Sequence, residues 1–255
     1  MSPLTVPSMP MACQRLDRLD ALRGLAIVWM AVFHFCFDLN HFGWLQPRQN
    51  FYADPFWTLQ RTAIVSLFLF CAGLSQAAAL GAGLSWPRFW RRWLQIAGCA
   101  VLVSVGSAIM FPGSWISFGV LHGIALMLVL TRLVAARLSV PALLALGAVI
   151  VLLPQFVAHP FFDSRWTNGV GLVTRKPVTE DYVPLLPWWG VMLWGLAAGR
   201  WVLAARPMWM GGAAAGPLHR AAQPMAVLGR WSLSFYMLHQ PVLIGLLTAA
   251  STMRA

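Results

Sequence analysis

Long apolar runs separated by short polar segments make up most of this chain. A helix that crosses a lipid bilayer needs about 20 mainly apolar residues, and seven stretches of roughly that kind follow one another. These stretches are Leu22–Phe37, Thr62–Gly83, Leu94–Phe111, Trp115–Leu133, Val140–Ala158, Leu185–Ala204 and Val227–Ala250. The pattern therefore predicts an all-α protein, a polytopic membrane bundle of about seven transmembrane helices that forms one domain over residues 22–250.

The amino-acid composition supports a membrane location. Of the 255 residues, 59% are hydrophobic and 10% are charged, whereas about 25% of the residues in a soluble domain are charged. Such a chain has too few polar side chains to cover an apolar core in water. Asp17 and Asp20 precede the first apolar run and no small-residue cleavage site follows it. We therefore interpret this run as a membrane span and not as a cleaved signal peptide.

The distribution of positive charge predicts an orientation. The net charge is +11, and the 18 Lys and Arg residues lie at the edges of the apolar runs. This placement favours attraction to anionic lipid headgroups over nucleic-acid binding. Twelve of these cations fall on one side of the predicted bundle and six on the other. We expect the richer side, with residues 1–21, in the cytoplasm of a bacterium. The tail 251–255 and the polar loops 38–61 and 159–183 then lie on the periplasmic side of the inner membrane.

Polar residues inside a membrane span cost free energy and are commonly functional. The first span carries Arg23, His34 and Asp38. Eleven residues make almost three helical turns, so Arg23 and His34 share one face, about 16 Å apart along the axis. Arg23 is therefore predicted to bind phosphate groups of a cytoplasmic donor. His34 is predicted to act as a base or acyl carrier. Asp38, one turn later, is predicted to orient the imidazole as the third member of a triad does.

Two further histidines lie at comparable depth on other predicted spans, His122 in the fourth and His239 in the seventh. Three histidines on separate helices are also a pattern for haem ligation. A haem-binding membrane cytochrome that uses His34, His122 and His239 is thus one alternative, and a small-molecule transporter is another. A transporter is expected to show internal repeats and broken helices, and the sequence has no clear sign of either.

Several segments together resemble a known family, the transmembrane acyltransferase superfamily. The first segment is Leu16–Val28 (LDRLDALRGLAIV) followed by His34, where the spacing of Arg23 and His34 resembles the acyltransferase-3 proteins. The closer resemblance is to small bacterial proteins related to the catalytic domain of heparan-α-glucosaminide N-acetyltransferase. It rests on Tyr52–Trp57 (YADPFW), Gln60-Arg61, Ser66–Phe70 (SLFLF), Phe118–His122 (FGVLH), Asp181–Trp188 (DYVPLLPW), Gly229–Leu233 (GRWSL) and His239-Gln240-Pro241.

The resemblance implies a membrane-embedded acyltransferase. Acetyl-CoA, or another acyl-CoA, is the implied cytoplasmic co-substrate, and a glycan or lipid-linked sugar is the implied periplasmic acceptor, with no metal. We expect the site between the first, second, fourth and seventh spans, beneath the two long loops. The residues expected to bind the acceptor or support the site are His41, Asp54, Arg61, His122, Asp181, His239 and Gln240.

The two related families differ in the catalytic histidine. The lysosomal enzyme resembled here is thought to use a histidine of its first luminal loop, and its first span has Asn at the position of His34. In this chain the first-loop candidate is His41. His34 fits the acyltransferase-3 spacing and is our preferred catalytic residue, with Asp38 as its partner and His41 as the alternative.

Overall fold

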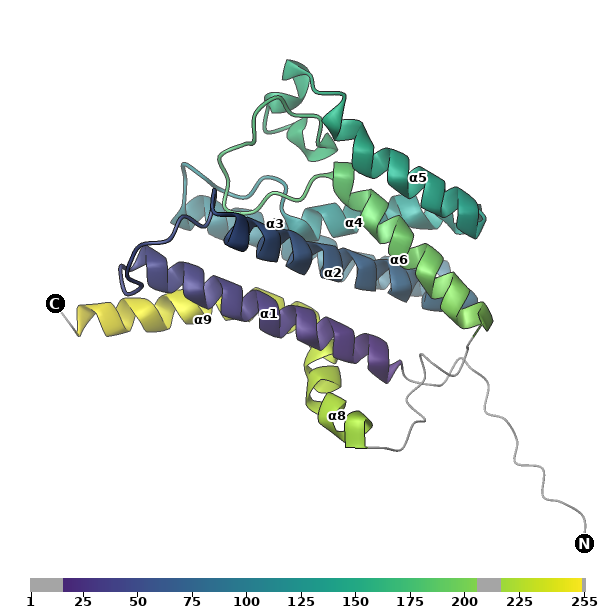
Figure 1. Cartoon of the computed structure of the whole chain (residues 1–255), viewed down its shortest axis with the longest axis horizontal. Coiled ribbons are helices and arrows are strands. Elements are labelled where there is room, and N and C mark those ends of the chain that lie inside the picture. Colours follow the sequence, from purple (N-terminus) through teal and green to yellow (C-terminus); the bar gives the residue numbers. More distant parts are fainter. Residues whose placement is uncertain (1–15, 206–216, 254–255) are drawn as a thin grey trace, which may run out of the picture.

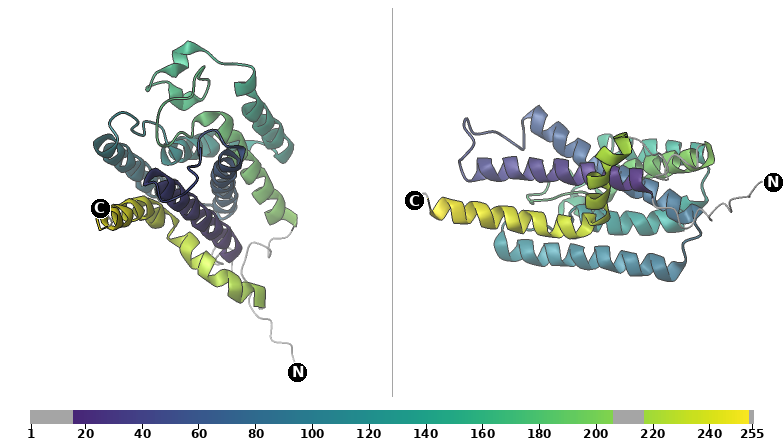
Figure 2. Two further views of the ribbon diagram at one scale, coloured as in Figure 1. Left: turned by 60° about the vertical axis from the view of Figure 1, so that its left-hand side comes forward. Right: turned by 90° about the horizontal axis from the view of Figure 1, so that it is seen from below.

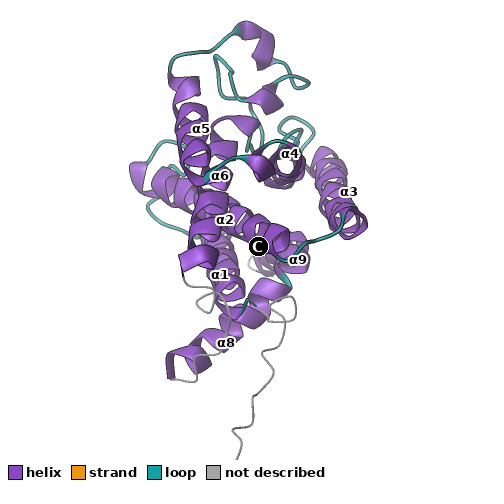
Figure 3. Ribbon diagram, turned by 90° about the vertical axis from the view of Figure 1, so that its right-hand side faces the viewer, coloured by secondary structure: helices purple, strands orange, loops and turns teal. Residues whose placement is uncertain are grey.

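The protein is a bundle of helices (Figure 3). The structure is a computed structural model that describes residues 16–205 and 217–253, and the regular elements in this part of the chain are all helical. The α-helices are α1 Asp17–His41, α2 Pro55–Gly81, α3 Trp86–Met110, α4 Val120–Leu133, α5 Val140–Leu152, α6 Leu185–Ala205, α8 Pro217–Arg230 and α9 Ser232–Thr252. Short 3-10 helices lie at Ala135–Arg137, Leu153–Gln155, Pro160–Asp163 and Asn168–Val170. The prediction of an all-α membrane bundle is confirmed.

Four of the described helices are long and apolar enough to cross a bilayer. They are α1, α2, α3 and α9, with 25, 27, 25 and 21 residues, which corresponds to roughly 30–40 Å at 1.5 Å per residue. The apolar helices α4 and α5 have 14 and 13 residues. Because these two are shorter than a full span, the number of seven crossings stays a prediction.

Large apolar side chains cover the outer surface of the bundle. Leu94, Leu102 and Ile109 on α3 and Leu238 and Leu246 on α9 are all more than 60% exposed. In water such surfaces would associate or aggregate, whereas in a bilayer they lie against lipid chains. The exposed apolar faces are therefore those of a multi-pass membrane protein.

Two predicted spans are longer than the helices that form. The fourth was predicted from Trp115, but α4 begins at Val120, after the turn that follows α3. The fifth was predicted to extend to Ala158, but α5 ends at Leu152 and a 3-10 turn containing Pro154 follows. Proline has no backbone N–H to continue the helical hydrogen bonds, which accounts for this end.

The prediction of an unbroken last span from Val227 is wrong, because the chain turns at Trp231 between α8 and α9. Helix α8 crosses α1 so closely that a Cβ added at Gly229 would lie 1.8 Å from the carbonyl oxygen of Asp20. Figure 2 shows this crossing. The loop predicted over 206–224 is also helical from Pro217, and residues 206–216 lie outside the described part.

Helix α1 lies between α2, α8 and α9, and α6 packs between α2 and α5. Figure 1 shows α1, α2 and α9 running alongside one another, with the end of α9 near the end of α1. A buried core that includes Leu69, Met127 and Met192 joins α2, α4 and α6 on the other side of α2. Helix α1, which carries the predicted polar residues, is thus packed against α2, α8 and α9.

Candidate active site

The imidazole of His34 contacts the imidazole of His239 across the α1–α9 interface. His34 Nδ1 lies 2.7 Å from His239 Nε2, and the two rings are parallel within 9°, with centroids 5.0 Å apart. His239 is 8% exposed, and its Nδ1 lies 2.7 Å from the carbonyl oxygen of Tyr236. The structure therefore brings together two of the predicted site residues, which are 205 positions apart in the chain.

The hydrogen-bond network assigns the tautomers of the two rings. A carbonyl oxygen only accepts, so His239 Nδ1 carries the proton that it donates to Tyr236. In the neutral ring Nε2 of His239 is then an acceptor, and the proton between the two rings belongs to Nδ1 of His34. Nε2 of His34 then carries a lone pair that has no hydrogen-bond partner among the described residues. A nitrogen of this kind can take a proton or attack an acyl group.

Asp38 lies on the same helix but binds a different partner from the one predicted. Both of its carboxylate oxygens accept from Gln240 Nε2, at 2.9 and 3.1 Å, and the residue is 4% exposed. Gln240 Oε1 is buried and has no hydrogen-bond partner among the described residues. The contact to the His34 ring that we expected from Asp38 is made by His239. Asp38 and Gln240 form a second α1–α9 contact, one turn nearer the C-terminal end of α1.

Arg23 is anchored at the opposite end of α1. Its Nη1 donates to Asp20 at 2.8 Å and its Nη2 donates to Ser75 of α2. Arg230 of α8 pairs with Asp17 at 2.8 Å and lies 3.8 Å from Asp20. The guanidinium has five N–H donors, so it retains donors beyond these two contacts. It is both a structural link between α1 and α2 and a candidate ligand for phosphate.

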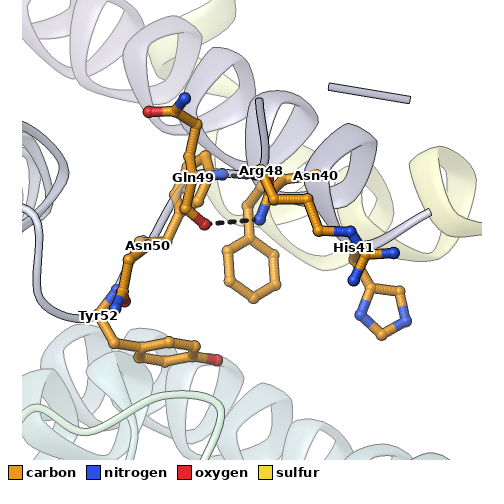
Figure 4. Close-up of a pocket in the computed structure, with 8 residues that line it drawn as sticks. Asn40, His41, Arg48, Gln49, Asn50 and Tyr52 are labelled. Atoms are coloured by element: carbon orange, nitrogen blue, oxygen red, sulfur yellow. Dashed lines mark hydrogen bonds between the residues drawn. The ribbon is translucent and has the colours of Figure 1, made fainter. Parts of the chain in front are cut away.

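A pocket of about 440 Å³ lies at the C-terminal end of α1, the end that we propose below to face outward, and it is called the outer pocket. Its polar lining comes from the last turn of α1 and the following loop, namely Asn40, His41, Arg48, Gln49, Asn50 and Tyr52 (Figure 4). The side chain of Asn40 donates to the backbone oxygen of Gln49 at 2.9 Å and accepts from its backbone N–H at 2.7 Å. These two hydrogen bonds fix the loop to the helix. The alternative catalytic residue, His41, lies in this pocket.

Asp181 comes from the second long loop and binds the start of α4. Its Oδ2 accepts from the backbone N–H of Val120 at 2.7 Å, where a negative group is favoured by the helix dipole. Burial raises the pKa of Asp181 to about 6, although backbone hydrogen bonds and the charges of Arg61 and Lys176 lower it. Asp181 therefore lies within electrostatic range of Arg61 and Lys176.

Asp54 and His122 have hydrogen-bond partners away from the His34–His239 pair. Asp54 is the N-cap of α2 and accepts from the backbone N–H of Phe56 at 2.8 Å. His122 Nδ1 accepts from Gly119 N–H at 3.3 Å, and its Nε2 lies 3.1 Å from Ser104 Oγ. Among the described residues no cluster of three His, Cys, Asp or Glu side chains could hold a metal ion. The two nitrogens of His122 are both engaged, which does not favour the three-histidine haem alternative.

Two contact residues were missed at the sequence level. Ser75 accepts from Arg23 and donates to the carbonyl oxygen of Cys71, and the polar pair Ser75-Gln76 inside an apolar run was a detectable signal. Arg48 lines the outer pocket but had been counted only as a loop charge. Its importance depends on how the loop folds back on α1, which no local pattern indicates.

The apolar helices and the polar contacts that join α1 to α9 define a class, that of a multi-pass membrane protein. Comparison with protein families specifies this class further. Residues 15–241 match the family model for the catalytic domain of heparan-alpha-glucosaminide N-acetyltransferase, and the chain belongs to this family. No curated protein and no solved structure matched the chain.

Proposed function

We propose that the protein transfers an acyl group, in the first instance acetyl, from cytoplasmic acyl-CoA to a sugar or glycan acceptor on the periplasmic side of the bacterial inner membrane. Membership of the N-acetyltransferase family supports the reaction class. The observation that carries the proposal for this chain is the free Nε2 of His34, which the His239 contact at 2.7 Å defines.

The reaction needs a base and a path for one proton. The acceptor oxygen or nitrogen attacks the thioester carbonyl carbon, so a C–O or C–N bond forms and the C–S bond breaks. Nε2 of His34 takes the proton of the acceptor and passes it to the departing sulfur, which leaves as the thiol of CoA. No proton is gained or lost overall. Transfer through an acyl group held on Nε2 of His34 has the same balance in two steps.

His239 stabilises the charged form of His34. When His34 is protonated, its Nδ1–H donates to His239 Nε2, while His239 donates to the Tyr236 carbonyl. Hydrogen bonds in such a chain polarise one another, and in a site of low dielectric this strengthens each bond. His239 therefore has the role that a carboxylate has in a triad, without adding a second charge inside the membrane.

Arg23 and His34 lie on one face of α1, and their positions along the helix match the two sides of the proposed reaction. Arg23 lies in the part of the bundle that we propose to face the cytoplasm, where its remaining donors can bind the phosphates of CoA. His34 lies eleven residues later, about 16 Å along the axis, a separation of the order of an extended pantetheine arm. The acceptor then approaches His34 from the outer end of α1.

Purified protein tests the proposal directly. Protein in detergent is incubated with labelled acetyl-CoA and cell-envelope glycan, next to a His34→Ala variant. We expect label on the glycan with the wild-type protein and almost none with the variant. Wild-type protein that transfers no label to any envelope fraction and releases no CoA would contradict the proposal.

The sidedness has its own test. Single cysteines are introduced into the segment 85–93 and into the loop 159–183 of an otherwise cysteine-free protein, and intact cells are treated with a membrane-impermeant thiol reagent. The Arg-rich segment is expected to stay unlabelled and the loop to be labelled. The reverse pattern would overturn the proposed orientation.

A further inference from the structure

The outer pocket has the chemistry of an anion-binding subsite. Arg48 and His41 both line it, and Figure 4 shows the guanidinium of Arg48 beside the ring of His41. No ion pair ties Arg48 to a carboxylate in the described part of the chain. An unpaired guanidinium presents a planar fork of donors that fits carboxylate or phosphate oxygens in a bidentate manner.

The carboxylates around the pocket have other partners. Asp38, which lies within electrostatic range of His41, accepts from Gln240 Nε2 with both carboxylate oxygens. Glu180, whose charge acts on Tyr52, accepts from Ser114 at 2.5 Å. Neither of these acidic residues lines the pocket. The cationic end of the pocket is therefore left for an external anion.

The rest of the lining fits a sugar unit. Phe37 and Tyr52 present aromatic rings, and Asn50 and Gln49 present amides. Tyr52 is 60% exposed, and its hydroxyl, with an ordinary pKa of about 10, is a hydrogen-bond donor at neutral pH. Aromatic faces cover the apolar side of a sugar ring, and a few placed polar groups fix its orientation.

The pocket is also held in shape before any ligand binds. Phe51 is 2% exposed and its ring stacks on Trp57, with centroids 4.0 Å apart. On the other side Asn40 makes two hydrogen bonds with the backbone of Gln49. A preformed site loses little conformational entropy on binding, which favours affinity.

We propose that this pocket binds an anionic group of the acceptor, with Arg48 as the residue that selects for the charge. This inference rests on the proposed acyl transfer and deepens it. His41 follows His34 by seven residues, roughly 10 Å along α1. The group held in the pocket is therefore a charged unit next to the unit that is acylated, and the reacting hydroxyl or amine lies deeper, at His34.

Equilibrium binding tests the pocket independently of catalysis. Full-length protein in detergent, without acyl-CoA, is titrated with methyl glucuronide, glucose 1-phosphate and the neutral methyl glucoside, and binding is measured by calorimetry. We expect at least one of the two anionic sugars to bind at least about tenfold more tightly than the neutral one, a difference of about 1.4 kcal/mol. Tighter binding of the glucuronide identifies an acidic glycan, and tighter binding of the phosphate identifies a phosphate-linked sugar.

Variants connect the charge preference to Arg48. Arg48→Gln is expected to remove the preference and Arg48→Lys to retain only part of it, because Lys lacks the planar fork. Arg175→Gln, which removes an exposed cation elsewhere in the outer loops, is the matched control and is expected to keep the preference. Equal binding of charged and neutral sugars, binding of none of the three, or a preference that survives Arg48→Gln would overturn the inference.

The closing comparison separates this inference from the proposed function. If the anionic sugars bind but no acyl transfer occurs with any acceptor, the acyltransferase proposal fails and the subsite stands. If transfer occurs equally to neutral and anionic acceptors in both wild type and Arg48→Gln, the acyltransferase proposal stands and the subsite is rejected.

Discussion

His34 and His122 both lie on apolar helices, yet their hydrogen bonds differ. His122 accepts from Gly119 with one nitrogen and contacts Ser104 with the other, and Ser104 in turn donates to the Ile116 carbonyl at 2.6 Å. In the described part of the chain, His34 has a hydrogen-bond partner at Nδ1 alone, namely His239. A buried polar group with all its partners stabilises a fold, whereas a positioned imidazole with one free nitrogen can also do chemistry. The comparison shows that the number of ring nitrogens with a hydrogen-bond partner, rather than burial of the ring, distinguishes a structural histidine from a candidate catalytic one.

The largest predicted effect is a rate difference between the two histidine variants. His34→Ala removes the proposed base and is expected to lower the rate of transfer by about 10²–10⁴. His122→Ala is expected to leave the rate per folded molecule within about tenfold, and to lower stability because it removes buried hydrogen bonds worth about 1–3 kcal/mol. Transfer rates and thermal unfolding of both purified variants check this. Equal losses of rate in two well-folded variants would remove the distinction.

The second effect tests whether His239 acts through His34. His239→Ala removes the acceptor that fixes the tautomer of His34, and a loss of about 10² in rate is expected, at the lower end of general-base contributions. His239→Gln retains an acceptor oxygen and should recover part of the rate. Steady-state kinetics of the two variants measure this. A His239→Ala protein with wild-type rate would show that the pair is only structural.

The third effect concerns Arg23, whose two contacts leave it both an anchor and a candidate ligand. Arg23→Lys keeps a cation beside Asp20, so folding and orientation should be retained. Because Lys cannot form the bidentate fork, the KM for acetyl-CoA is expected to rise about tenfold, equivalent to about 1.4 kcal/mol, with kcat little changed. Kinetics with varied acetyl-CoA measure this. An unchanged KM would assign Arg23 to anchoring alone.

The smallest effect is on the pH dependence of stability. The folded pKa of Asp181, about 6, lies above its ordinary value of 3.8 because of burial. The folded state therefore binds this proton more tightly than the unfolded state. The resulting stabilisation is fully present below about pH 4 and is lost as pH rises through 6. Relative to Asp181→Asn, the wild-type protein should lose about 1–3 kcal/mol across this window, measured as thermal unfolding midpoints in detergent. Parallel curves for the two proteins would contradict the assignment.

The sequence predicted the class of fold and one face of the site, because both depend on local patterns. Apolar runs of span length identify helices, and helical periodicity places Arg23, His34 and Asp38 on one face. These statements need no knowledge of which helices are neighbours. The break at Trp231 was not predicted, because it depends on the packing of Gly229 against α1 and on the pairing of Arg230 with Asp17.

The partners across helices were not predictable in the same way. The periodicity of α1 does not indicate which helix packs against it. It therefore could not predict that His239 contacts His34 or that Gln240 hydrogen-bonds to Asp38. Asp38 was the natural local partner of His34, since the two residues are one turn apart. The contact between the helices gives each residue a partner on α9 instead.

The most direct test of the central claim, that His34 is the catalytic histidine, compares His34→Gln with His41→Ala. Glutamine can still donate to His239 but has no basic nitrogen, so the fold is kept while the proposed base is lost. With purified proteins and labelled acetyl-CoA, single-turnover transfer should fall by about 10²–10⁴ in His34→Gln. His41→Ala is expected to retain the rate of transfer at saturating acceptor and to weaken acceptor binding. If His41→Ala abolishes transfer while His34→Gln retains most of it, His41 is the catalytic residue and the account given for His34 is wrong.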